Sequence, residues 1–318
     1  MGPVLRKDGG VIRLRVLAFT DVGLRRKRNE DAVLVAGWLC QSHDGALATM
    51  DFAPTAPFVC MVADGMGGHA GGNIASKLAL TVLAERSPQW RTVDDVAASV
   101  AYANDQVRGA GVETGLEGLG TTLAGLCLVA DRIIVFNVGD SRVYSITGGQ
   151  PQQLSHDDSV YDVNGHPTNV ITQSLGQPGP VQTHVTTLPL QRGTYLMCSD
   201  GVSGMLTDAE LRAALTPVDL VDCAANIING TRSKGAEDNF SFVIVDIPDA
   251  SSEATEPAEI ESVAPRSPAP PPPPVGPPGP RPMTGAPQSP MAPGPAWRSM
   301  PPPPPRRQRP PPPAARLR

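Results

Sequence analysis

The chain has 318 residues, of which 40% are hydrophobic, so it can bury a sizeable core over most of its length. Its formal net charge of −5 conceals an asymmetry, because eight arginines and no acidic residue follow Val263, leaving −13 for residues 1–262. This acidic main part excludes a nucleic-acid surface as its principal function and favours divalent cations as ligands.

Short apolar and β-branched runs, each closed by Gly, Asp or Asn, predict strands. They lie at Val11–Thr20, Ala32–Trp38, Pro57–Ala63, Thr121–Ala130, Arg132–Val138, Arg142–Ile146, Thr194–Cys198 and Phe240–Asp246. Apolar residues at helical spacing predict helices at Asn73–Glu85, Val93–Val107, Asp208–Leu215 and Val218–Ile228. So many strands require two sheets or a barrel, and their segregation from the helices favours an α+β fold over a doubly wound one.

Proline usage divides the chain. Of the 36 prolines, 25 follow Glu253, where almost no aliphatic residue is available for burial. We therefore predict an N-terminal lead over residues 1–10, one folded domain over 11–248, and a disordered proline- and arginine-rich tail over 249–318. Proline runs in this tail suit a partner with an aromatic-lined groove, and a plain spacer is the alternative.

The five cysteines are dispersed and odd in number, without close Cys-Cys or Cys-His spacing. This argues against a disulfide framework and against a zinc site, and it fits a cytoplasmic protein. The first ten residues contain no apolar segment of the kind found in signal peptides. The longest apolar stretch, Leu123–Val138, is interrupted by charged residues, so we expect no membrane span. We also expect the protein to be a monomer.

Four aspartates far apart in the sequence, Asp31, Asp64, Asp200 and Asp238, each end or follow a strand-like run. Asp140 follows another predicted strand in the same way. Carboxylates placed where strands meet loops can be gathered into one site by folding. Oxygen ligands of this kind suit Mg²⁺ or Mn²⁺.

The segment from Asp64 to Gly72 contains five glycines in nine residues. Its backbone can approach an ion or an anion closely, and the predicted helix that follows directs its N-terminus nearby. A simple glycine-rich turn between strand and helix is the alternative. The dinucleotide-binding fingerprint and the P-loop ending are both absent, which argues against a nucleotide site.

Seven segments occur in an order that resembles the metal-dependent serine/threonine phosphatases, the PPM or type 2C family. The resemblance covers roughly residues 14–247, and the Met-Gly-Gly-His form after Gly65 is similar to the bacterial branch. The matching segments are Gly23–Asp31, Ala63–His69, Gly120–Thr122, Asn137–Arg142, Leu175–Gly176, Cys198–Gly201 and Glu237–Asn239.

This resemblance implies a central β-sandwich of two mainly antiparallel sheets flanked by helices, with two Mn²⁺ or Mg²⁺ ions at one end. Asp64 would bridge the ions, with Glu30 and the Gly65 carbonyl on one ion. Asp200 and Asp238 would bind the other ion. Asp31 would act in the outer shell or through water, and Asp140 with Asp200 would hold a third, weakly bound ion.

Two such ions lower the pKa of a bridging water and stabilise charge during in-line displacement at phosphorus. The phosphate must also be oriented, and an arginine does this through two parallel hydrogen bonds. By its position in the family motif, Arg26 is the predicted phosphate ligand. A solvated basic turn formed by Arg25, Arg26, Lys27 and Arg28 is the simpler alternative.

Two departures from the family pattern affect mechanism and specificity. Met66 stands where many eukaryotic members have a histidine proposed as general acid, so the proton donor is unassigned. His69 and a metal-bound water are the candidates, and we expect His69 only to cap the loop. Residues Val160–Ser174 are shorter than the flap usual in bacterial relatives, which predicts broad peptide selectivity and a weak third ion.

The sequence therefore favours hydrolysis of phosphoserine and phosphothreonine in proteins, opposing a bacterial serine/threonine kinase. A weakly active scaffold of the same fold is one alternative, disfavoured because all the metal carboxylates are present. A dedicated anti-sigma-pathway phosphoserine phosphatase is the other.

Overall fold

The computed structural model describes residues 6–7, 10–42, 44–54, 57–67, 71–116, 118–147, 150–163, 167–217 and 219–248. The predicted tail over 249–318, His69 and most of the predicted lead lie outside these residues, and the domain boundaries stay predictions. The first strands are β1 (Arg6–Lys7), β2 (Gly10–Val11), β3 (Leu14–Asp21), β4 (Ala32–Val35), β5 (Trp38–Cys40), β6 (Ala46–Phe52), β7 (Phe58–Ala63), β8 (Gly65–Met66) and β9 (Gly120–Thr121). The remaining strands are β10 (Leu123–Val129), β11 (Arg132–Val138), β12 (Arg142–Thr147), β13 (Gln150–Gln153), β14 (Ser159–Tyr161), β15 (Pro167–Ile171), β16 (His184–Pro189), β17 (Gly193–Cys198) and β18 (Phe240–Ile247). The helices are α1 (Gly72–Arg86), the 3₁₀ helix Ser87–Gln89, α2 (Val93–Thr114), α3 (Asp200–Ser203), α4 (Asp208–Ala214) and α5 (Leu220–Ser233).

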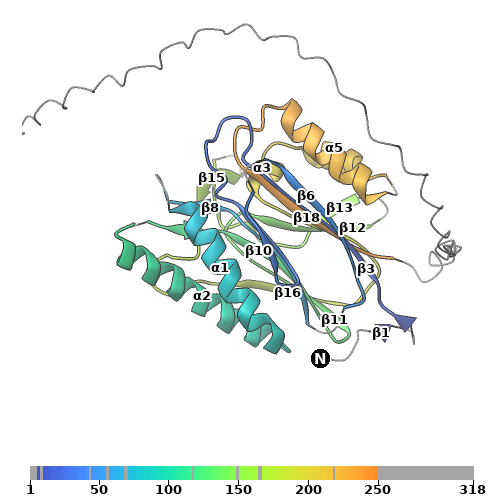
Figure 1. Cartoon of the computed structure of the whole chain (residues 1–318), viewed down its shortest axis with the longest axis horizontal. Helices are drawn as coiled ribbons and strands as arrows, with labels where there is room; N and C mark the ends of the chain where they lie inside the picture. Colours follow the sequence, from blue (N-terminus) through green and yellow to red (C-terminus); the bar gives the residue numbers. More distant parts are fainter. Residues whose placement is uncertain are drawn as a thin grey trace, which may run out of the picture. The chain divides into compact units, whose positions relative to one another are not determined.

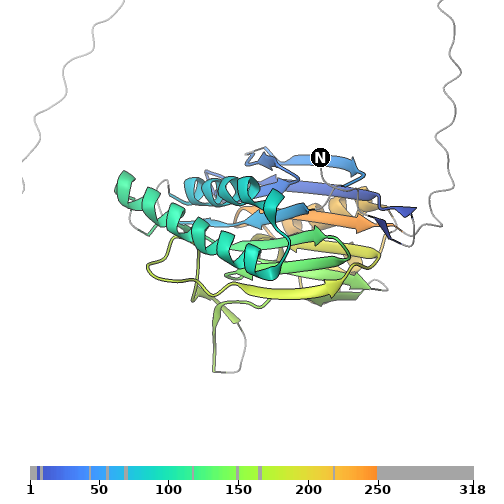
Figure 2. The ribbon, with the colours of Figure 1, turned by 90° about the horizontal axis from the view of Figure 1, so that it is seen from below.

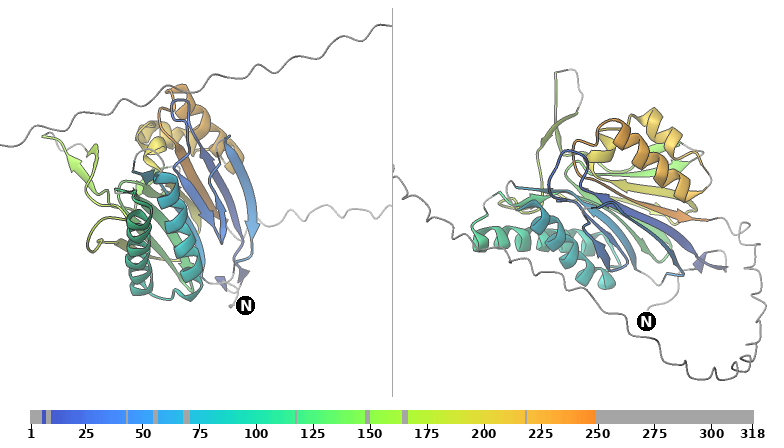
Figure 3. Two further views of the ribbon diagram at one scale, coloured as in Figure 1. Left: turned by 60° about the vertical axis from the view of Figure 1, so that its left-hand side comes forward. Right: turned by 45° about the horizontal axis from the view of Figure 1, so that its top comes forward.

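Two six-stranded antiparallel sheets form the centre of the molecule. The first sheet has the order β16-β11-β10-β7-β4-β5, and the second has the order β13-β12-β17-β18-β3-β6. Helices α1 and α2 cover the outer face of the first sheet, while α5 lies over the second, as Figure 1 and Figure 3 show. The predicted sandwich of two sheets between helix layers is confirmed.

Three apolar cores hold these four layers together. Alternate residues of each central strand face opposite sides, so Leu34 and Met61 pack under α1 and α2, while Val33 and Val62 pack between the sheets. In the second sheet, residues such as Phe242 face α4 and α5. Strands buried on both faces have no polar side to present, which explains why they read as continuous apolar runs.

Three of the strands that the sequence did not predict, β6, β13 and β16, are edge strands of the two large sheets. Strand β6 alternates between half-buried and exposed side chains, and β13 and β16 are mostly exposed or half-buried. The predicted strand Ala32–Trp38 is two strands, because Ala36 and Gly37 adopt positive φ angles of 47° and 90° and turn the chain. Edge strands carry fewer buried residues, so their apolar signal is weak.

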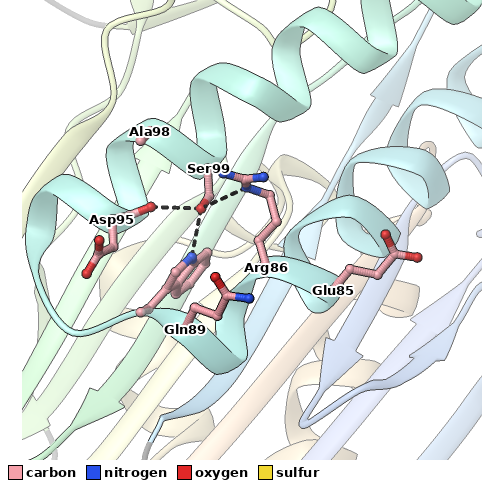
Figure 4. A pocket seen from close by; sticks show the side chains of 7 residues that line it. Glu85, Arg86, Gln89, Asp95, Ala98 and Ser99 are labelled. Atoms are coloured by element: carbon pink, nitrogen blue, oxygen red, sulfur yellow. Dashed lines mark hydrogen bonds between the residues drawn. The ribbon is translucent and has the colours of Figure 1, made fainter.

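A buried tryptophan joins the two long helices. Trp90 Nε1 donates to Ser99 Oγ at 2.8 Å, and Ser99 Oγ donates to the Asp95 carbonyl at 2.7 Å, as Figure 4 shows. Arg86 Nε also donates to Ser99 Oγ, at 3.2 Å. A hollow of about 300 Å³ lies beside these residues. The Ser99 hydroxyl accepts two hydrogen bonds and donates one, so it has no capacity left for a ligand. We therefore interpret this hollow as part of the packing between α1 and α2.

Strands β14 and β15 form a hairpin that projects from the body of the fold (Figure 2 and Figure 3). Val160, Tyr161 and Val170 on it are exposed. The predicted short flap over Val160–Ser174 therefore contains a two-stranded ribbon, which the sequence analysis did not anticipate. Among the described residues, no helix combines the length and the apolar character needed to cross a bilayer.

Candidate metal centre and active site

The ends of several strands meet at one edge of the sandwich. In the first sheet Ala32 pairs with Ala63 and Leu123 pairs with Val138, so the start of β4 and the ends of β7 and β11 lie together. In the second sheet, Cys198 at the end of β17 pairs with Phe242 near the start of β18. Each predicted aspartate lies at or beside one of these strand ends, and this antiparallel register explains how residues far apart in sequence meet.

A cleft of about 400 Å³ opens at this edge. Seven of the eight predicted site residues line it, and Asp31 does not. The lining residues come from both sheets, from the loops between strands, and from Ile171 at the end of β15. They are Arg26, Glu30, Asp64, Gly65, Met66, Gly67, Thr122, Asp140, Ile171, Asp200, Asp238 and Asn239.

Burial and mutual repulsion make this carboxylate group unfavourable in the ionised state. Desolvation, followed by the charges of Asp31 and Asp200, raises the pKa of Asp64 well above its usual range. Desolvation likewise raises the pKa of Asp200, which shares a hydrogen bond with Asp64. Burial and the nearby Asp200 raise the pKa of Asp140 to about 6. A cation bound in the cleft would offset the repulsion between these carboxylates and stabilise their ionised state.

Two buried carboxylate oxygens have no hydrogen-bond partner among the described residues: Asp31 Oδ1 and Asp200 Oδ1. Buried polar atoms without partners are rare in folded proteins, because each costs about 1–3 kcal/mol of stability. Asp31 is fully buried, and its other oxygen accepts a hydrogen bond from Ser199 Oγ at 2.8 Å. These unused oxygens, with an all-oxygen donor set around them, fit a hard divalent cation.

The arginine-rich loop before β4 is held in place by Asn239. Its side-chain Nδ2 donates to the carbonyls of Val22 and Arg28, both at 2.9 Å, and its Oδ1 accepts from the Glu30 backbone N–H at 2.8 Å. This clamp fixes Glu30 at the cleft. It also brings Arg26 close enough for its Nη2 to donate to Asp238 Oδ2 at 2.5 Å.

The glycine after Asp64 is required by close packing. A Cβ on Gly65 would overlap the Gly72 and Glu30 carbonyl oxygens. The Gly65 N–H donates to the Glu30 carbonyl at 3.2 Å, and the Asp64 carbonyl accepts from Thr121 Oγ1 at 2.9 Å. No larger residue fits at position 65 without moving the backbone that presents Asp64.

Three residues with positioning roles were not identified from the sequence. Ser199 orients Asp31 by donating a hydrogen bond to its Oδ2. Thr122 Oγ1 accepts from the Asp64 N–H at 3.0 Å, and Asn239 clamps the loop. All three residues lie within the motif segments. Their roles could not be predicted from the sequence, because their hydrogen-bond partners are 58 to 217 residues away. Met66 lines the cleft as expected from its position, and a thioether has no proton to donate.

A sequence profile described as "Protein phosphatase 2C" matches residues 39–237 of the chain. That match spans more than half of the sequence. The chain belongs to the protein phosphatase 2C family. The resemblance read from the seven motif segments is thereby confirmed, and the enzyme is a serine/threonine protein phosphatase.

Curated relatives and solved structures of this phosphatase family match about the same share of the chain, 74–76%. Protein phosphatase PhpP of Streptococcus pneumoniae is 31% identical over 263 residues, covering 76% of this chain and 100% of PhpP. The solved serine/threonine phosphatase of S. agalactiae has a TM-score of 0.63 and 28% identity, covering 74% of this chain and 100% of that one. The catalytic domain of PstP, solved in complex with two manganese ions, has a TM-score of 0.60 at 28% identity, covering 75% and 100%.

Proposed function

We propose that this phosphatase hydrolyses phosphoserine and phosphothreonine in proteins with two divalent cations, Mn²⁺ or Mg²⁺, held in the cleft. The observation that carries the proposal is the pair of buried oxygens, Asp31 Oδ1 and Asp200 Oδ1, left without partners among the described residues. Such an arrangement costs stability unless a ligand completes it. The manganese ions in the PstP structure support the choice of metal.

The residues fit the ions as follows. Asp64 would be shared by both ions, with Glu30 and the Gly65 carbonyl on one ion and Asp200 and Asp238 on the other. Asp31 would act from behind, in the outer shell, and Asp140 would join Asp200 at a weak third ion. Bound together, the two cations supply an activated water and stabilise charge on the phosphoryl oxygens.

Arg26 would orient the phosphate. Its guanidinium is half exposed at the mouth of the cleft and donates to Asp238 Oδ2, so it already lies beside the proposed cation ligands. The hydrogen bond that Arg26 donates to Asp238 raises the pKa of Arg26, so the guanidinium is charged at every working pH. An Asp238 that turns to a cation would release Arg26 for two parallel hydrogen bonds to phosphoryl oxygens.

The physiological setting we propose is reversal of phosphorylation by a bacterial serine/threonine kinase, in line with relatives named as bacterial serine/threonine phosphatases. The weakly active scaffold is less favoured, because every predicted carboxylate reaches the cleft or lies directly behind it. The dedicated phosphoserine phosphatase differs only in substrate, which peptide profiling separates.

Phosphate release from a phosphothreonine peptide tests the proposal. With Mn²⁺ we expect turnover that is abolished by a chelator, and a loss of kcat of at least about 10³-fold in Asp64→Asn, since the substitution removes the negative charge of the side chain shared by the cations. Asp131→Asn is the matched control, because Asp131 lies in an exposed turn far along the sheet from the cleft. Full activity in Asp64→Asn, or no turnover by the wild type with either metal, would contradict the proposal.

A further inference from the structure

Two histidines and an aspartate gather at the base of the projecting hairpin, outside the cleft. One ligand atom from each of His156, Asp158 and His184 lies within 4.8 Å of the other two. None of the three lines the cleft, and the phosphatase reaction proposed above does not use them. We propose that they form a separate site for a transition-metal cation, with Zn²⁺ as its expected occupant.

The side chains are already directed toward one another. His184 Nε2 lies 2.7 Å from Asp158 Oδ1, and the rings of His156 and His184 stack with centroids 4.5 Å apart and an interplanar angle of 28°. Ligand atoms on a tetrahedral zinc lie about 3.3 Å apart when each is about 2.0–2.1 Å from the ion. In the metal-bound site the three ligand atoms, now within 4.8 Å of one another, would lie at about that spacing.

The backbone around the cluster is fixed by one short segment, residues 137–139. Asn137 is the cross-strand partner of His184. Its side chain also clamps the loop, because Nδ2 donates to the His156 carbonyl at 2.6 Å and Oδ1 accepts the His156 N–H at 3.1 Å. The Gly139 N–H donates to Asp158 Oδ2 at 2.9 Å, and Asp158 N–H donates to the Gly139 carbonyl. All three ligands are therefore positioned from the end of β11.

The surrounding hydrogen bonds match what a metal ligand needs. Asp158 is buried, and its Oδ2 is oriented by the Gly139 amide while Oδ1 is directed toward His184. A carboxylate held in this way by a second partner is typical of metal sites. The neighbouring cation, Arg142, is instead paired with Asp157 at 2.7 Å. Asp158 Oδ1 also accepts from Gln173 Nε2 at 3.0 Å, so a cation bound here would compete with an amide donor and not with an arginine.

The donor set selects the kind of metal. Two imidazoles and one carboxylate are the ligands that zinc takes in three-ligand sites, and imidazole suits it far better than Mg²⁺. Three protein ligands leave a fourth position open, and His156 is exposed, so water could complete the coordination. The cysteine spacing analysed in the sequence could not reveal this site, because none of its ligands is a cysteine and His184 is 26 residues from Asp158.

An occupied site would tie three parts of the phosphatase together. The Asp158 carbonyl accepts from the Thr172 N–H at the base of the β14–β15 hairpin, and Gly139 directly precedes Asp140 in the cleft. His184 begins β16, at the edge of the first sheet. A cation bound here would therefore stiffen the hairpin base and the turn that carries Asp140.

Zinc stoichiometry tests the site. The full chain is dialysed against a few-fold molar excess of Zn²⁺ with millimolar Mg²⁺ present, and bound zinc is measured by elemental analysis. We expect His156→Ala and His184→Ala each to bind one equivalent less than the wild type, and Thr186→Ala, an exposed neighbour on β16, to bind the wild-type amount. Asp64→Asn should keep this equivalent, which separates it from any zinc taken by the cleft.

A second measurement follows the five histidine rings by NMR. Addition of Zn²⁺ to Asp64→Asn should shift the ring signals assigned to His156 and His184, and these shifts should disappear in the corresponding alanine variants. Because His156 is exposed, His156→Ala is expected to fold normally even if His184→Ala does not. Unchanged zinc stoichiometry in His156→Ala, or ring signals of His156 and His184 that do not respond to zinc, would overturn the proposal.

Discussion

At the scale of single residues, the buried carboxylates that suit a metal ion lower the stability of the metal-free protein. Asp31 shows this most clearly, since it is fully buried and keeps one oxygen without a partner among the described residues. Burial raises its pKa to about 7, against a usual value of 3.8. A carboxyl group with a raised pKa binds a proton more tightly in the folded state than in the unfolded one, so its ionisation favours unfolding.

The metal-free protein should therefore lose stability as the pH rises from 3.8 to about 7, the interval between the unfolded and folded pKa values of Asp31. Asp31→Asn removes this penalty, so in chelator at pH 8 we expect it to be more stable than the wild type by on the order of 2 kcal/mol. Below pH 4 the two proteins should have the same dependence on pH. Denaturant unfolding at both pH values measures the difference.

Added Mn²⁺ at pH 8 provides the control for that experiment, because it should stabilise the wild type more than Asp31→Asn. An asparagine variant that is less stable than the wild type in chelator at pH 8 would show that Asp31 is not under electrostatic strain.

The sequence placed the aspartates at the correct strand ends, because a carboxylate after an apolar run is a local feature. It could not separate Asp31 from the others by burial. That difference depends on Ser199 and Ser241, which lie more than 160 residues away in the chain and pack over Asp31 from the second sheet. The grouping of His156 with Asp158 and His184 was not predicted either, because His184 is 26 residues from Asp158 in the chain.

At the scale of elements, helix starts were predicted well because their signals are local. Both α2 and α4 begin with a capping box, in which Thr92 with Asp95 and Thr207 with Glu210 satisfy the first backbone N–H groups. The strands that were missed have no such signal. Strand β16 reads His-Val-Thr-Thr-Leu-Pro and is recognised only by its pairing with β11.

The capping box of α4 also carries an ion pair, and the two effects can be separated. The hydrogen bond from Lys234, followed by those from Thr207, lowers the pKa of Glu210 to about 2. Glu210→Gln keeps the capping geometry but removes the charge, so we expect a lower Tm than the wild type at pH 7. A depressed carboxyl pKa contributes stability above its unfolded value, so the difference should shrink as the pH falls from 4.5 toward 2.

Two further variants complete this test. Lys234→Met should show the same narrowing of the Tm difference at low pH, because it removes the other half of the ion pair. Thr207→Ala should cost about 1 kcal/mol at pH 7 and keep most of that cost at low pH, since it removes the cap itself. A Tm difference for Glu210→Gln that does not change with pH would assign its effect to helix capping.

At the scale of the whole molecule, the order of the motifs along the chain predicted the fold more securely than any single segment. Each motif marks a strand end that faces the same edge, and only the sandwich brings all of them to one cleft. What the sequence could not give was the hairpin of β14 and β15, whose residues are largely exposed, and the base that it shares with the cluster of His156, Asp158 and His184.

The position of the last strand makes a prediction about where the folded domain ends. Strand β18 lies between β17 and β3 and pairs with both along most of its length, so it is a central strand of the second sheet. Directly after it, the Pro248 carbonyl accepts from Arg192 Nη1 at 2.6 Å. The proline-rich composition beyond residue 253 offers almost nothing to bury.

A chain that stops after Pro248 should therefore keep the Tm of the full-length protein within about 2 °C, and its kcat/KM for a short phosphopeptide should be unchanged. Removal of only five more residues, to end at Val243, should prevent folding, because Ile244, Val245 and Ile247 then leave two cores. Calorimetry of the three lengths measures both effects. A large loss of Tm on ending at Pro248 would mean that the proline-rich segment packs against the folded domain.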